Sequence, residues 1–192
     1  MDPIQLLAQH LAAQSSLKQD QINLICSHFR VEKVRPEVRI ASQGRPYGKL
    51  VFVADGILRV FVVTPDGDEV VKNFVEQNGF FADLECTEKD RPAVLNLSAV
   101  THCTLLTLSK MDSARLVKLF PNWEHMMREG AMRAMNEMIR KQEFLRIGTS
   151  AEQYRHLVEN FPNLIQHVSL KHIASYLRIT QSSLSRIRKQ GW

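Results

Sequence analysis

The chain has 192 residues, 44% of them hydrophobic, which is enough for one large domain or two small ones with buried cores. No run of eighteen apolar residues occurs and the N-terminus lacks the features of a signal peptide, so we expect a cytoplasmic protein without membrane contact. Cys26, Cys86 and Cys103 form no CxxC pair and no disulfide framework, so we expect buried thiols and neither a metal nor a cofactor.

The net charge of +5 is unevenly distributed. Residues 140–192 contain 9 Lys and Arg against 3 acidic residues, and from Ser169 onward there are five basic residues and no acidic one. Such a terminus is typical of nucleic-acid binding, although charge alone is equally compatible with a solvated basic tail.

The first 121 residues are predicted to form an antiparallel β-roll or barrel preceded by helices. Residues 1–30 have a helical pattern, with Ser16 and Gln19 as a possible capping box. Beyond them, short runs of β-branched and aromatic residues alternate with the turn signals Asp55-Gly56 and Pro65–Asp68. The predicted strands are Val51–Val53, Leu58–Val63, Val70–Val75, Val94–Val100 and Cys103–Leu108.

A long helix is predicted over residues 122–147, directly after Pro121. Small and flexible apolar residues recur close to a heptad spacing along it, with Lys141 as an interruption, and this pattern favours a close helix partner from a second subunit. The alternative is a helix that packs only on its own β-roll. The expected interface residues are Met127, Ala131, Ala134, Met138 and Leu145.

The last predicted domain, residues 148–192, begins at a helix break. Gly148 suits the end of the long helix, and Thr149 or Ser150 can cap the next one, which Pro162 ends. The overall expectation is therefore an α+β chain, in which a dimerisation helix joins a β-roll to a small helical domain.

A helix-turn-helix pattern lies near the C-terminus. Ser169 can cap a helix whose apolar face is Leu170, Ile173, Ala174 and Leu177. A short turn over residues 178–180 leads to a second helix, 181–189, in which Leu184 and Ile187 point inward. Two small amphipathic helices of an ordinary helical domain are the alternative reading.

The outer positions of the second helix favour DNA binding, because every one of them carries a hydrogen-bond donor and none is acidic. We expect Gln181 and Arg186 to reach base edges, with Arg186, about 140° around the helix from Gln181, approaching from the flank. The predicted DNA-binding residues are Ser169, Lys171, Thr180, Gln181, Ser182, Ser183, Ser185, Arg186, Arg188 and Lys189.

These motifs resemble the Crp/Fnr (cyclic-AMP receptor protein) family, through Leu170–Leu177 followed by Ser183–Ile187 and through Val53–Gly56 upstream. The resemblance covers nearly the whole chain. It implies a cyclic-nucleotide-binding β-roll, a dimerising central helix, and a homodimer that binds double-stranded promoter DNA and acts on RNA polymerase. It also implies that Gln181, Ser182 and Arg186 contact bases. The hairpin wing that many winged-helix domains carry after the recognition helix is not expected here.

The segment that corresponds to the family's phosphate-binding site departs from the family pattern. The family carries Gly-Glu and then Arg-Ser-Ala or Arg-Thr-Ala, whereas this chain has Ala82 and Asp83, then Arg91, Pro92 and Ala93. Pro92 removes a hydroxyl and a backbone N–H that would face a phosphate. We therefore expect an unknown small-molecule effector, or none, in place of cyclic AMP.

Two other classes of protein are alternatives to a DNA-binding regulator. A metal-dependent β-barrel enzyme needs converging His and carboxylate ligands, but the strand region offers only His102, and no GxSxG, HExxH or Walker-type motif occurs. The other alternative is a small-ligand sensor whose helix-turn-helix is degenerate and binds DNA weakly.

Overall fold

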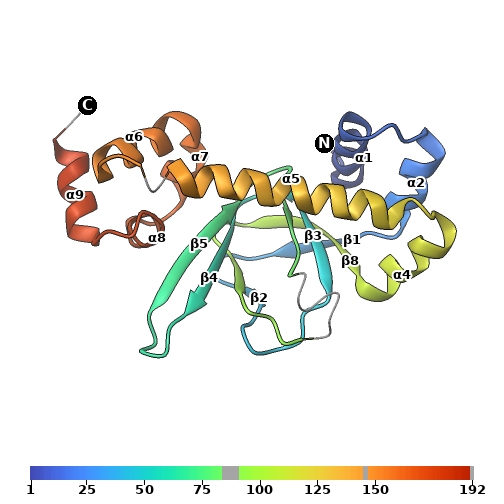
Figure 1. Ribbon diagram of the computed structural model, residues 1–192, viewed down its shortest axis with the longest axis horizontal. Coiled ribbons are helices and arrows are strands. Elements are labelled where there is room, and N and C mark those ends of the chain that lie inside the picture. Colours follow the sequence, from blue (N-terminus) through green and yellow to red (C-terminus); the bar gives the residue numbers. More distant parts are fainter. Residues whose placement is uncertain (84–90, 145–146, 191–192) are drawn as a thin grey trace.

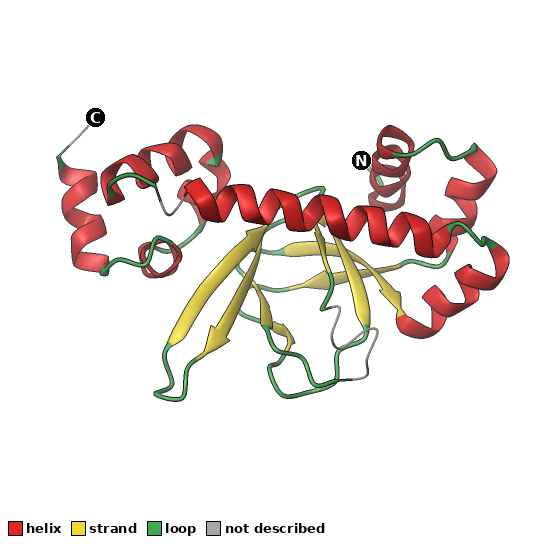
Figure 2. Ribbon diagram, viewed as in Figure 1, coloured by secondary structure: helices red, strands yellow, loops and turns green. Residues whose placement is uncertain are grey.

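The computed structural model describes the chain except for residues 84–90, 145–146 and 191–192. A β-roll lies beneath the long helix α5, Trp123–Phe144, which spans the molecule (Figure 1). Helices gather at the two ends of α5, with the N-terminal helices at one end and the C-terminal helices at the other (Figure 2). The predicted α+β architecture is confirmed.

Two short helices, α1 (Pro3–Gln14) and α2 (Gln19–Ser27), precede the roll. The predicted capping box at Ser16 and Gln19 is wrong, because α2 starts at Gln19 itself and Lys18 is its N-cap. The side chain of Gln21 accepts the Lys18 N–H at 3.0 Å, so this glutamine satisfies the start of the helix from three residues downstream.

The roll consists of two four-stranded antiparallel sheets. The first has the order β1 (Arg30–Val34), β8 (Cys103–Ser109), β3 (Lys49–Asp55) and β6 (Phe80–Phe81), and the second β2 (Arg39–Ala41), β7 (Asn96–Ala99), β4 (Leu58–Val63) and β5 (Glu69–Val75). All five predicted strands are confirmed to within two residues. The strands β1, β2 and β6 were not predicted, because they are short or carry alternating charged residues.

Strand β3 shows how the roll builds two cores. Val51 and Val53 point between the sheets, into a core that also contains Leu58 and Leu97. The residues between and after them, Phe52 and Ala54, pack on the other side, against α1, α2 and the start of α5. Successive side chains of a strand point to opposite faces, so a fully apolar strand such as β3 must be covered on both sides.

The Asp55-Gly56 turn joins β3 to β4, as predicted, but the two strands belong to different sheets and form no hairpin. Gly56 adopts φ +94°, in the left-handed region that favours glycine. The hairpin of the second sheet lies one connection later, where Thr64 and Asp68 close the β4–β5 turn with a 2.9 Å backbone hydrogen bond.

Helix α4 (Lys110–Leu119) follows the last strand and was not predicted. The Ser109 hydroxyl caps it, accepting the Asp112 N–H at 3.0 Å. Helix α5 then begins within one residue of the predicted position, and Trp123 anchors its start by donating its indole N–H to the Ser113 hydroxyl at 2.9 Å. The predicted end of this helix, including Leu145, falls partly outside the described residues.

Four helices form the C-terminal part: α6 (Ser150–Asn160), α7 (Pro162–His167), α8 (Leu170–Tyr176) and α9 (Gln181–Lys189). Thr149 caps α6 as predicted, accepting the Glu152 N–H at 3.4 Å, and Gly148 has φ +92°. Pro162 ends α6 and also starts α7, which was not predicted. Over the described part of the chain, no helix is both long and apolar enough to cross a membrane.

Gly56→Ala and Gly67→Ala form a matched pair that separates backbone strain from steric conflict. Gly67 has φ +90° with nothing within 4 Å of an added Cβ, so Ala there should cost about 1 kcal/mol of stability. At Gly56 an added Cβ would also lie 2.5 Å from the His102 carbonyl oxygen, which should raise the cost to about 2–4 kcal/mol. Urea unfolding measures the free energy of unfolding of both variants. Equal losses of stability would contradict the steric conflict proposed at Gly56.

Candidate nucleic-acid interface

Hydroxyl side chains cap both helices of the predicted helix-turn-helix. Ser169 accepts the His172 N–H at 3.4 Å at the start of α8, and Thr180 accepts the Ser183 N–H at 3.1 Å at the start of α9. These caps satisfy backbone donors that a helix start leaves unpaired. Ser169 and Thr180, two of the predicted DNA-binding residues, therefore already have a structural role.

The turn between the helices contains one residue in an unusual conformation. Arg178 has φ +58°, the left-handed region that a residue with a Cβ adopts at a cost of about 1–2 kcal/mol. The Ile179 N–H returns to the Ala174 carbonyl at 3.0 Å, which closes the turn, and Ile179 packs into the core of the domain. The tight turn brings α9 across α8 over Ala174, which is 2% exposed.

Helix α9 has one buried side and one polar side. Leu184 is fully buried and Ile187 packs against the same core. With about 100° of rotation per residue, the direction opposite these two residues passes between Ser182 and Lys189. Arg186 lies about 50° from the middle of the exposed face, whereas Gln181 lies about 90° away. Arg186 is thus nearer the centre of the polar face than Gln181, which the sequence argument did not anticipate.

The other predicted DNA-binding residues divide by exposure. Gln181, Ser182, Arg186, Arg188 and Lys189 are exposed on α9, and Lys171 is exposed on α8, whereas Ser183 and Ser185 are half-buried. Arg186 is close to the Ser183 hydroxyl, at 3.5 Å. Burial, together with the nearby Arg59, lowers the pKa of His172, so this imidazole is neutral at pH 7 and the positive charge of α8 here comes from Lys171.

The structure separates the predicted interface residues of α5 into different environments. Met127 packs against the helix side of the first sheet, and Ala134 and Met138 line a groove facing the turn between β5 and β6. Ala131 is half-buried, and Leu145 lies outside the described residues. Of these residues Met127 packs on the chain's own roll, whereas Ala134 and Met138 remain exposed beside the groove, so the interface predicted from the heptad pattern stays a prediction.

The outward face of α5 carries a different apolar stripe: Met132, Met135 and Ile139, with 57%, 50% and 41% of their surface exposed. Their spacing of three and four residues places them on one side of the helix. This stripe was missed because the heptad pattern was assigned to the more regular set of residues. The sequence did contain a signal for this stripe, namely the spacing of three and four residues between Met132, Met135 and Ile139.

The predicted effector residues serve the roll itself. Asp83 is 4% exposed, and its carboxylate accepts the Val94 N–H at 3.1 Å. The Ala93 N–H donates to the Arg45 carbonyl at 2.9 Å, and Pro92 has no N–H to offer. The backbone donors from Pro92 to Val94 are thus absent or already used. Ala82 is half-buried, and Arg91 is exposed.

A groove of about 290 Å³ lies between α5 and the turn from β5 to β6, and the sequence did not predict it. Half-buried Glu76 lies in it near Lys141; burial raises the pKa of this carboxyl, and the neighbouring ammonium partly opposes that shift. The lining residues are Asn73, Phe74, Val75, Glu76, Gln77, Asn78, Gly79, Phe80, Ala134, Glu137, Met138 and Lys141. Within the described residues, no cluster of three or more His, Cys, Asp or Glu could hold a metal ion.

The roll matches a known family. Residues 31–119 match the family model described as the cyclic nucleotide-binding domain. The match ends with α4, so it covers the roll and α4 but not α5 or the C-terminal helices.

Solved structures extend the similarity to the C-terminal helices. The c-di-GMP-responsive global regulator CLP of Xanthomonas campestris aligns with a TM-score of 0.71 at 16% identity, covering 90% of this chain and 91% of that one. FixK2 of Bradyrhizobium japonicum also gives 0.71 at 16% identity, over 84% and 83% of the two chains. The catabolite activator protein of Thermus thermophilus gives 0.58 at 18% identity, over 91% and 84%.

The resemblance to Crp/Fnr regulators is therefore confirmed in the fold of nearly the whole chain. No curated protein matches the sequence.

Proposed function

We propose that this protein is a DNA-binding transcription regulator of the Crp/Fnr type, and that it works in the cytoplasm without catalysing a reaction. The observation that carries the proposal is helix α9, which is capped, packed through Leu184 and Ile187, and polar without acidic residues on its outer face. A helix of this kind fits the major groove, where Arg and Gln can read base edges and Ser and Lys can hold phosphates. RNA polymerase is the proposed downstream partner.

The proposed DNA complex contains a homodimer that places two α9 helices in successive major grooves, about 34 Å apart or a multiple of that distance. The outward stripe of α5, Met132, Met135 and Ile139, supports dimerisation, because three large apolar side chains remain exposed on one face. Ala131 and Met138 lie toward the edge of this face and can join the interface. Leu145 stays a prediction.

The proposed regulator does not respond to cyclic AMP. The hydrogen bonds of Asp83, Ala93 and Val94 support this, because the groups that would meet a sugar or a phosphate hold the loop together instead. The groove beside α5 offers another place for a small effector, with a carboxylate, an ammonium group and amide groups in its lining.

Arg186→Ala and Arg188→Ala should have different effects on DNA affinity. Arg186 is exposed about 50° from the middle of the polar face, within reach of base edges, so its loss should cost about 1–3 kcal/mol on a selected site and little on scrambled DNA. Arg188 lies toward the edge and the C-terminal end, so its loss should weaken both duplexes alike and reduce the salt slope by about one. Fluorescence anisotropy on both duplexes at several salt concentrations measures this.

Equal losses for Arg186→Ala on both duplexes would make this residue a phosphate contact. If neither variant changed binding, α9 would not be the reading element. A wild-type protein that selects no sequence from a random DNA pool would favour a ligand sensor with a degenerate helix-turn-helix.

Met135→Glu should convert the dimer to a monomer at micromolar concentration, because it places a carboxylate in the centre of the apolar stripe. Met111→Glu on α4 is the matched control, since Met111 is 59% exposed and lies away from α5's stripe. Sedimentation velocity reports the mass of each variant. A 22 kDa wild-type species, or a Met135→Glu dimer as tight as the control, would contradict the proposed interface.

Cyclic AMP should produce no binding heat at micromolar protein concentrations. The variant Pro92→Ser should behave in the same way, because it restores a hydroxyl and an N–H but leaves the amides of Ala93 and Val94 engaged. Isothermal calorimetry tests both proteins. Micromolar affinity in the wild type would show that the loop rearranges around the nucleotide, against this prediction.

A further inference from the structure

Strand β5 ends the second sheet, so one edge of its backbone has no neighbouring strand among the residues that the structure describes. Such an edge presents N–H and C=O groups that need other partners. In a parallel pair of strands, a residue of the neighbouring strand would donate its N–H to one carbonyl and accept the N–H two residues further along. On β5, the carbonyl of Glu69 and the N–H of Val71 form such a pair.

The hydroxyl of Ser175, on helix α8, takes the place of that missing residue. It accepts the Val71 N–H at 3.0 Å and donates to the Glu69 carbonyl at 3.3 Å. A serine hydroxyl has one donor and can accept, so a single side chain satisfies both backbone groups. The contact spans more than a hundred residues of sequence and joins the helix-turn-helix directly to the roll.

The strand side of this contact is held firmly. The Glu69 carboxylate accepts from the Arg59 guanidinium at 2.6 Å and from Arg39 at 3.2 Å. Arg59 is 4% exposed and stacks over the Phe61 ring at 4.0 Å. Because Glu69 is fixed by two arginines, its carbonyl offers Ser175 a defined position.

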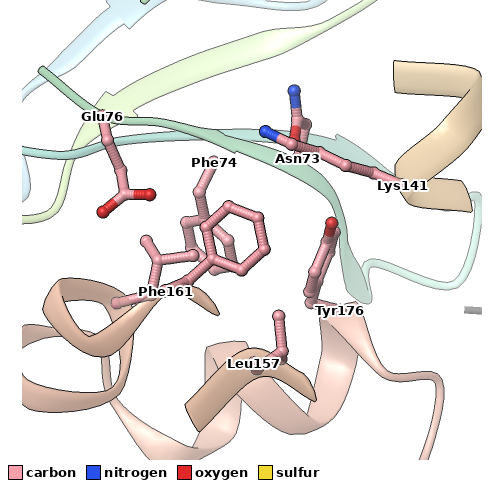
Figure 3. A pocket seen from close by; sticks show the side chains of 8 residues that line it. Asn73, Phe74, Glu76, Lys141, Leu157, Phe161 and Tyr176 are labelled. Atoms are coloured by element: carbon pink, nitrogen blue, oxygen red, sulfur yellow. The ribbon is translucent and has the colours of Figure 1, made fainter. Parts of the chain in front are cut away.

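Apolar contacts extend the same junction. The Tyr176 ring meets Phe74 of β5 edge-on, with 5.4 Å between ring centroids. Lys141 of α5 lies over the Phe161 ring at 5.1 Å. Figure 3 shows these side chains converging from the roll, from α5 and from the C-terminal helices, around a small pocket that Leu157 also lines.

We infer that Ser175 is a positioning residue, which fixes the direction of the recognition helix α9 relative to the roll and thereby the spacing of half-sites that a dimer accepts. This inference rests on the proposed function. Helices α8 and α9 share a core at Ala174 and Leu184, so they move together. In the docked arrangement Arg186 stays exposed, so the contact with β5 leaves the reading face accessible.

A fixed direction of α9 affects DNA binding when a dimer binds two half-sites at the same time. When both recognition helices are held at a fixed separation, binding at one half-site presents the second helix at a high effective concentration. If α8 is held loosely on the roll, the second recognition helix adopts many orientations. The dimer then binds DNA with the preferred half-site spacing less tightly and discriminates less against other spacings. A single half-site is not affected, because it needs only one helix.

The test uses a duplex selected by the full-length wild-type protein, variants of it with one or two base pairs added or removed between half-sites, and a half-site duplex. Ser175→Ala should lose about tenfold in affinity for the selected spacing and should distinguish the spacings poorly. Its affinity for the half-site should stay within about twofold of the wild-type value. Ser175→Thr keeps the hydroxyl and should restore the spacing preference.

Ser27→Ala is the matched control, because Ser27 is an exposed helix serine whose hydroxyl bonds locally, to the Leu24 carbonyl and the His28 ring. Ser175→Cys is a second variant with nearly the same volume but a weak hydrogen-bonding group, and it should behave as Ser175→Ala does. Amide exchange of the free protein gives an independent measurement. The Val71 amide should exchange faster in Ser175→Ala and at the wild-type rate in Ser27→Ala.

The outcomes separate the two claims. A wild-type protein that selects no DNA overturns the proposed function, and the inference about spacing with it. A wild-type protein that binds DNA, together with a folded Ser175→Ala or Ser175→Cys variant that keeps the wild-type spacing preference, overturns the inference alone. Equal losses on the half-site and on the full site would assign Ser175 to domain stability, which also overturns it.

Discussion

The outer faces of the two sheets of the β-roll are apolar, and the roll cannot bury either of them by itself. Phe52, Ala54, Leu106 and Leu108 point away from the core between the sheets of the roll. On the second sheet, Val71 and Phe74 do the same. Each face needs helices from another part of the chain, since exposing such side chains to water costs about 1.5–3 kcal/mol each. The arrangement of the helices follows from this requirement.

The N-terminal helices, α4 and the start of α5 cover the first sheet, and the helix-turn-helix covers part of the second. The helices that are proposed to read DNA are thus also the cover of a sheet edge. Only one side of α9 is needed for packing, which leaves Ser182, Arg186 and Lys189 on a polar surface. Packing and the proposed DNA reading use opposite sides of the same short helix, so neither compromises the other.

The sequence was sufficient to predict those elements whose residue pattern lies within a single segment of the chain. The strands from β3 to β8 with strong apolar runs, the caps at Thr149, Ser169 and Thr180, and the turn before α9 all followed from local residue types. The charged residues of β1 concealed a strand, because three of its five residues are exposed. The heptad pattern on α5 was real, but periodicity cannot tell whether a stripe faces a partner or its own roll.

Other features depend on contacts between distant residues. Val71 and Phe74 are three positions apart and would point to opposite faces of a regular strand. An irregularity of register opposite Val60 and Phe61 lets both reach the same cluster. The match between the Ser175 hydroxyl and two backbone groups of β5 is likewise invisible in sequence. Ser175 appears there only as one polar residue on an amphipathic helix.

Lys141 connects the groove beside α5 with the C-terminal helices. Its side chain lines the groove beside α5 and also the small pocket where β5, α5 and the C-terminal helices meet. The ammonium group lies near Glu76 on one side and over the Phe161 ring on the other. A charged group that enters the groove therefore competes for the same lysine that contacts the helix-turn-helix domain. Asp83 and Ala93, in contrast, bond to Val94 and Arg45, all within the roll.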